Sequence, residues 1–121
     1  MTTQIPKYLF AIFVFLLHCA SFAQQIQTIA FYNVENLFDT IDGPNDDAEF
    51  LPSAESKWDA QKYGAKLVHI RQVMAELNMP MVMGVCEIEN RTVLEDVIGQ
   101  DKRYGIVHYE SPDARGIDAA M

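Results

Sequence analysis

The chain has 121 residues and a net charge of −8, because its 17 acidic residues outnumber its 9 lysines and arginines. Such an acidic surface repels nucleic-acid backbones unless a metal ion or a local basic patch intervenes, and the sequence shows no cluster of basic residues. Composition therefore argues against a tight nucleic-acid binder, but it allows a metal-dependent hydrolase.

Residues 1–23 are predicted to be a secretory signal peptide. Lys7 precedes an entirely apolar run, residues 8–17, and Ser21 and Ala23 provide small side chains at the two positions where a signal peptidase requires them. The run is too short to span a bilayer, so we expect cleavage before Gln24 and export to the periplasm or the medium, with no stable membrane span after processing. An uncleaved membrane anchor is the alternative.

Cys86 would be the sole cysteine after this cleavage, which excludes an internal disulfide. A catalytic thiol would need a partner base, and His69 and His108 are candidates only by default. We therefore interpret Cys86 as a small buried strand residue, His69 as a surface residue and His108 as a packed or edge histidine.

The first half of the chain is predicted to contain a strand, a long loop and a helix. Residues 25–32 form the strand, and residues 39–56 form a solvated loop because they are dense in turn residues. Ser56 is predicted to cap the helix, with Asp59 in a capping-box position. An apolar stripe follows at helical spacing: Tyr63, Leu67, Ile70, Met74 and Leu77. The basic residues of this helix are predicted to be solvated and without function: Lys62, Lys66 and Arg71.

The second half begins with a strand at residues 81–86, which a right-handed crossover would place parallel to the first strand. Thr92 and Glu95 are predicted to form a capping box at the start of a second helix. Residues 104–109 are predicted to be a strand, and residues 117–121 to begin another, so that the two form a hairpin. This order of elements indicates an α/β fold.

Polar side chains stand where both buried strands end. Asn33 and Glu35 follow the first apolar run, and Glu87 follows the second. Ligands of open α/β sheets bind at the carboxyl ends of the strands, and carboxylate and amide oxygens suit a hard cation such as Mg²⁺ or Ca²⁺. The alternatives are that Glu87 is a surface acid and Asn33 a turn residue.

Three segments together carry a resemblance: residues 31–38 (FYNVENLF), residues 85–91 (VCEIENR) and residues 111–120 (SPDARGIDAA). They resemble the opening half of the endonuclease/exonuclease/phosphatase superfamily, and its exported bacterial branch most of all. The resemblance implies a four-layer α/β sandwich with a mixed central sheet and divalent-metal-dependent cleavage of phosphoester bonds. Residues 24–121 are accordingly expected to be a partial domain, truncated at its carboxyl end.

The resemblance also implies roles for individual residues. Asn33 and Glu87 match catalytic positions, Glu87 as a metal ligand and Asn33 in orienting the phosphate and the metal-site network. Glu35 matches a second metal-ligand position, and Arg115 and Asp118 match positions near the substrate. Mg²⁺ is the expected cofactor, with Mn²⁺ or Ca²⁺ as alternatives.

The sequence departs from the family pattern in one respect. The base and the remaining acids of this family stand in a later Asp-x-Asn segment and a terminal Asp-His pair, and neither is present here. We therefore expect this chain by itself to be inactive. Its substrate would be a nucleic acid or a small phosphorylated molecule, and nuclease and phosphatase activities are not separated. A noncatalytic secreted binding domain on the same scaffold is the alternative function.

Overall fold

The computed structural model describes residue 8 and residues 26–121, so the predicted signal peptide lies, apart from Tyr8, outside the described residues. The elements, in chain order, are β1 (Ile29–Leu37), the 3-10 helix η1 (Ala48–Phe50), α2 (Ala60–Glu76), β2 (Val82–Ile88), α3 (Arg91–Ile98) and β3 (Asp118–Ala120). Within the described part of the chain, none of the helices has both the length and the apolar character needed to span a membrane.

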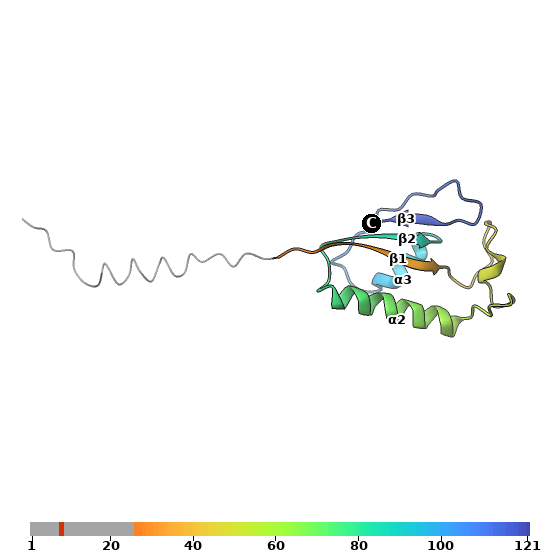
Figure 1. The fold of residues 1–121 in the computed structure, drawn as a ribbon, viewed down its shortest axis with the longest axis horizontal. Coiled ribbons are helices and arrows are strands. Elements are labelled where there is room, and N and C mark those ends of the chain that lie inside the picture. The colour runs from red at the N-terminus through yellow and green to blue at the C-terminus, as the bar shows by residue number, and fades with distance from the viewer. Residues whose placement is uncertain (1–7, 9–25) are drawn as a thin grey trace, which may run out of the picture.

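The strands form one mixed sheet in the order β1-β2-β3 (Figure 1). β1 and β2 are parallel and are connected through α2, whereas β3 is antiparallel to β2. This confirms an α/β domain with a mixed sheet. The carboxyl ends of β1 and β2 and the amino end of β3 therefore meet at one edge of the sheet.

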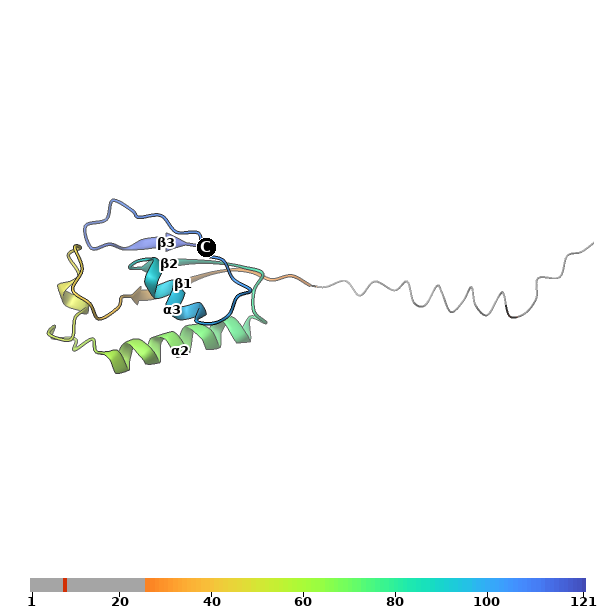
Figure 2. The ribbon, with the colours of Figure 1, turned by 180° about the vertical axis from the view of Figure 1, so that it is seen from behind.

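Both helices pack against the same face of the sheet (Figures 1 and 2). Side chains of β1 alternate: Val34 is buried in the core, whereas Ile29 and Phe31 are each 72% exposed. The core on the helix side is made of Val34, Leu37, Leu67, Ile70, Met74, Val85, Ile88, Val93, Leu94 and Val97. Neither α2 nor α3 packs against the opposite face of the sheet.

Both parallel strands extend further towards their carboxyl ends than the sequence pattern predicts, and β1 begins at Ile29, so the predicted strand start at residue 25 is wrong. Their pairing continues from Asn33 opposite Cys86 to Leu37 opposite Ile88, with a register shift between these pairs. Backbone pairing does not require apolar side chains, so the strands extend through the polar residues that the sequence places after them. Asn33 and Glu87 consequently lie inside strands.

Both predicted helix caps are wrong by a few residues. Asp59, in an extended conformation, caps α2 by accepting the Lys62 N–H at 2.9 Å, whereas the Ser56 hydroxyl donates to the carbonyl of Glu49. Asn90 likewise caps α3 by accepting the Val93 N–H at 3.1 Å. Asp and Asn are strong capping residues because their side-chain oxygens reach the first free amides of a helix.

The predicted strand at residues 104–109 is reduced to a single bridge between His108 and Ala120. Arg91 donates to the carbonyl of Ile106, and the hydroxyl of Tyr104 donates to the carbonyl of Pro80. Because these side-chain contacts hold the segment against neighbouring elements, only its end pairs with β3. Of the predicted hairpin, the structure thus confirms only the pairing at the end far from the turn.

Gly64 lies inside α2, and a Cβ built on it meets no atom within 4 Å. Glycine in a helix interior lowers stability because it loses more backbone entropy on folding than alanine does. Gly64→Ala is therefore expected to raise the free energy of unfolding by about 0.5–1 kcal/mol. Urea denaturation measures this change, and a lower midpoint would contradict it.

Arg71 is not the purely solvated residue that the helical pattern predicts. Its Nε donates to the Val97 carbonyl at 2.8 Å and its Nη2 to the Asp96 carbonyl at 2.5 Å, both in the last turn of α3. Arg71→Met is expected to lower the free energy of unfolding by about 1–2 kcal/mol, because these carbonyls lose their partner. Lys102→Met, at an exposed position, is the control in the same denaturation assay and should show no such loss.

Candidate functional site

Asn33 and Glu87 come into direct contact at the shared carboxyl edge of β1 and β2. The amide Nδ2 of Asn33 donates to Oε1 of Glu87 at 2.6 Å, although the residues are 54 positions apart. The other carboxylate oxygen, Oε2, has no hydrogen-bond partner among the residues that the structure describes. The two predicted site residues are therefore in direct contact, and one carboxylate oxygen of Glu87 is available to a ligand.

The backbone around this pair is strained. Glu35, Asn36 and Glu87 have φ angles of 56°, 61° and 63°, a left-handed region that costs a non-glycine residue about 1–2 kcal/mol. Neighbouring contacts maintain this conformation: Oδ1 of Asn33 accepts the Glu35 N–H at 2.7 Å, and Lys66 donates to the Glu35 carbonyl at 3.2 Å. Such strain concentrates at functional sites. Lys66, predicted to be without a role, thus supports the strained turn.

The oxygen donors at this edge are of the chemical type that a hard divalent cation binds. Glu87 offers a carboxylate oxygen, Asn33 an amide oxygen with a second lone pair, and Glu35 an exposed carboxylate two residues further along β1. Oxygen ligands with open positions for water are what Mg²⁺ requires.

Arg115 lies in the loop that leads into β3. Its guanidinium pairs with the Asp113 carboxylate at 3.1 Å and is about half exposed. Asp113 holds the pKa of Arg115 above its usual range, and the charges of Glu49 and Glu87 add to this effect. The guanidinium of Arg115 thus keeps part of its surface open to solvent.

Two loops meet beside the site, the loop of residues 39–56 and the loop of residues 111–117 (Figure 1). The Asp46 N–H donates to the Ala114 carbonyl at 2.9 Å. Gly116, with φ of 73°, lies so close to Asn45 that a Cβ on the glycine would be 2.1 Å from the amide nitrogen of Asn45. The loop that carries Arg115 is thereby fixed against its neighbour.

Part of the loop predicted to be solvated is in fact buried. Asp47 and Glu89 are 3% and 4% exposed. Glu89 accepts the Asp39 N–H at 2.8 Å, and Asp47 accepts the Gly43 N–H at 3.2 Å. Burial raises the pKa of Glu89, and the carboxylates of Asp39 and Asp47 raise it further. These acids shape the loop, a role that no local sequence signal reveals.

Asp118 is buried rather than presented to a ligand. Its side chain is 0% exposed; Oδ2 lies 2.7 Å from Nε2 of His108, and Oδ1 accepts the Ser111 N–H at 2.7 Å. With both oxygens bonded inside the protein, Asp118 has no exposed atom with which to contact a substrate. The position near the substrate that the resemblance implies for Asp118 stays a prediction, whereas the burial of His108 confirms it as a packed histidine.

His108, Glu110 and Asp118 have potential metal-ligating atoms within 4.8 Å of one another. Asp118 faces Nε2 of the His108 ring, however, whereas Glu110 lies 4.0 Å from Nδ1. The distance of 2.7 Å between Nε2 of His108 and Oδ2 of Asp118 is that of a hydrogen bond, and a ring nitrogen that donates its proton to Asp118 has no lone pair for an ion. This group is better described as a hydrogen-bonded cluster.

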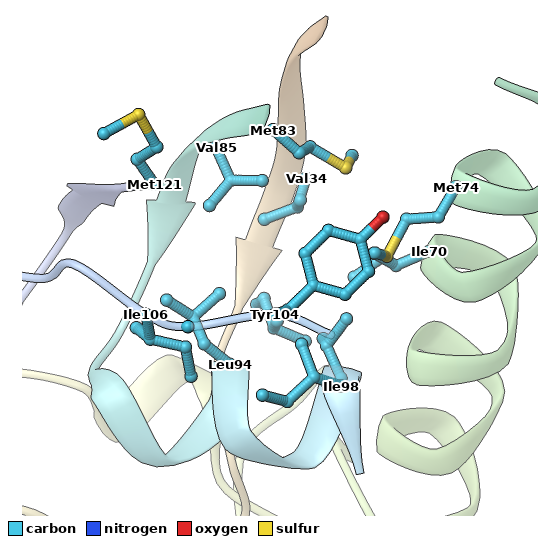
Figure 3. A pocket seen from close by; sticks show the side chains of 13 residues that line it. Val34, Ile70, Met74, Met83, Val85, Leu94, Ile98, Tyr104, Ile106 and Met121 are labelled. Atoms are coloured by element: carbon cyan, nitrogen blue, oxygen red, sulfur yellow. The ribbon is translucent and has the colours of Figure 1, made fainter. Parts of the chain in front are cut away.

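An apolar cavity of about 60 Å³ lies on the helix side of the sheet, away from the exposed Asn33. Figure 3 shows its lining, which comes from both parallel strands, α2, α3 and the segment around Tyr104. Its walls offer almost no polar atoms. The cavity therefore belongs to the core and not to the candidate site.

The fold and the site define an α/β domain with an amide and carboxylates at the carboxyl ends of parallel strands, where ligands of such sheets bind. A family model described as the Endonuclease/Exonuclease/phosphatase family matches residues 28–121. The chain belongs to this family, whose members generally hydrolyse phosphoester bonds and usually use divalent metals. No curated protein and no solved structure matches the chain significantly.

Proposed function

We propose that this chain provides the metal-binding half of a divalent-metal-dependent phosphoester hydrolase. The contact of 2.6 Å between Asn33 and Glu87 is the observation that carries the proposal, because it joins polar side chains of two neighbouring strands in one acidic site. Mg²⁺ is the proposed ion, and Mn²⁺ or Ca²⁺ would suit the same oxygens.

In this proposal each side chain of the site has a separate role. Glu87 and Glu35 hold the ion, and the Asn33 amide fixes the Glu87 carboxylate and helps to orient the phosphate. Arg115 contacts a phosphoryl oxygen through its planar guanidinium. When bound, the ion neutralises charge on the phosphate and lowers the pKa of a coordinated water. It also makes an acidic site compatible with an anionic substrate.

The four-layer sandwich is part of the same proposal. Ile29 and Phe31 leave an apolar sheet face exposed, and a second sheet packed against it would bury these side chains. We propose that residues following Met121 supply this sheet, together with the missing Asp-x-Asn segment and the Asp-His pair. We further propose export of the protein, after removal of residues 1–23, to the periplasm or the medium.

A noncatalytic secreted binding domain is the second candidate function. It is favoured by the histidines of residues 26–121: His69 is exposed on α2, and His108 is buried against Asp118, so neither is placed as a general base beside Glu87. The reading frame beyond Met121 separates the two functions. A downstream Gly-Asp-x-Asn and a late Asp-His pair would support the hydrolase, and their absence would support the binding domain.

Hydrolysis of bis(p-nitrophenyl) phosphate tests the proposal directly. The protein encoded by the complete reading frame and the 121-residue chain are assayed in parallel, with Mg²⁺, Mn²⁺, Ca²⁺ or EDTA. We expect metal-dependent activity from the first and none from the second. An inactive complete protein would contradict the hydrolase, and an active 121-residue chain would contradict the need for a second half. Nucleic-acid and phosphomonoester substrates would then distinguish nuclease from phosphatase.

A further inference from the structure

We infer that His108 is a positioning residue for Arg115 and that it acts through the buried carboxylate of Asp118. The inference rests on the proposed function, because Arg115 is the proposed phosphate contact of that site. The His108 and Asp118 side chains are 5% and 0% exposed, and their Nε2 and Oδ2 atoms are 2.7 Å apart. Because both side chains are buried, any influence of His108 on a bound phosphate must pass through the structure between them.

The path to Arg115 is a continuous series of hydrogen bonds. Asp118 places Oδ2 within 2.7 Å of Nε2 of His108 and accepts the Ser111 N–H, also at 2.7 Å, with Oδ1. The Ser111 hydroxyl then accepts the Asp113 N–H at 3.1 Å and donates to the Ile117 carbonyl at 2.9 Å. Asp113 in turn accepts the Arg115 N–H at 2.8 Å and pairs with its guanidinium. The loop is thus closed across its base and held to β3 through Asp118.

A histidine is needed at this position because a carboxylate only accepts hydrogen bonds. A buried carboxylate is strongly disfavoured unless donors satisfy it. Ser111 supplies one donor from the backbone, and the other donor must come from the ring, which fixes the His108 proton on Nε2. Without that donor, Asp118 would move towards water and release the Ser111 amide, and with it the loop that presents Arg115.

The first test is structural and does not depend on activity. Long-range ¹H–¹⁵N spectra of the full chain should show His108 protonated on Nε2. In His108→Leu, the Ser111 amide should exchange with solvent at least about tenfold faster, since its acceptor is displaced. His108→Gln, whose amide nitrogen can replace Nε2 as donor, should retain slow exchange. His69→Leu, at an exposed position on α2, is the matched control. Unchanged exchange in His108→Leu would overturn the inference.

The second test uses inorganic phosphate with Mg²⁺ as the probe. We expect His108→Leu and Arg115→Gln each to raise the phosphate dissociation constant about tenfold, the value of one charge-assisted hydrogen bond. The double variant should bind no more weakly than Arg115→Gln alone, because both changes remove the same contact. Additive losses would show that His108 acts independently of Arg115 and would overturn the inference.

Asp118→Asn keeps the inference testable if His108→Leu does not fold. Its Oδ1 can still accept the Ser111 N–H, which turns the amide NH₂ towards His108 and should move the ring proton from Nε2 to Nδ1. An unmoved proton would overturn the inference. Should the wild-type chain bind no phosphate, the proposed function fails at this site, whereas the ring proton and the Ser111 exchange still decide whether His108 anchors the loop.

Discussion

Glu87→Gln is expected to lower the affinity of the chain for Mn²⁺ or Mg²⁺ by at least about tenfold, or 1.4 kcal/mol. The amide removes the negative charge that attracts the ion, but its oxygen can still accept the Asn33 hydrogen bond seen at 2.6 Å. The free energy of unfolding should therefore change by less than about 0.5 kcal/mol. In the complete protein, the same substitution should abolish metal-dependent hydrolysis.

Two measurements on the same samples check this prediction. Calorimetric titration with Mn²⁺ gives the affinity, and urea denaturation followed by fluorescence of Trp58, the single tryptophan, gives the stability. Trp58 is well placed as a reporter because its Nε1 donates to the Phe38 carbonyl at 2.9 Å, just beyond β1. Glu55→Gln, an exposed loop acid, is the matched control and should leave binding unchanged. A parallel loss of fold in Glu87→Gln would identify Glu87 as a structural acid instead.

Gly116→Ala is expected to lower the free energy of unfolding by about 2–3 kcal/mol. Part of this loss is backbone strain, since Gly116 has φ of 73°, a conformation that alanine adopts only at a cost. The remainder is steric, because the new Cβ would lie 2.1 Å from the Asn45 amide nitrogen. The contact between the two loops beside the site should loosen as a result.

A second substitution separates the two causes. Asn45→Ala removes the group that clashes, so the cost of Gly116→Ala measured in the Asn45→Ala background should fall to about 1–2 kcal/mol of backbone strain. Gly105→Ala is the control, because a Cβ there meets nothing within 4 Å and φ is not positive. Equal effects of Gly116→Ala and Gly105→Ala in urea denaturation would contradict the loop geometry described here.

The sequence predicts the elements best where one local pattern dominates. The apolar run before Glu87 and the helical stripe around Ile70 correspond to β2 and α2, and the three family segments are confirmed by the match over residues 28–121. The helix caps are predicted at the wrong residues because each helix start offers two good capping residues close together. These are Ser56 and Asp59 for α2, and Asn90 and Thr92 for α3. The backbone geometry around them selects the cap.

The sequence by itself determined the α/β class, the family and the assignment of Asn33 and Glu87 to two neighbouring strands, because strand periodicity and short motifs are local properties. Only the tertiary structure decided that Arg71 binds α3, that Asp118 is buried on His108 and that the Arg115 loop rests on Asn45. The sequence separation of the partners differs from one contact to the next, so no helical or strand period predicts these contacts. Tertiary packing decides which residues become partners, and the spacing of residue types along the sequence does not reveal it.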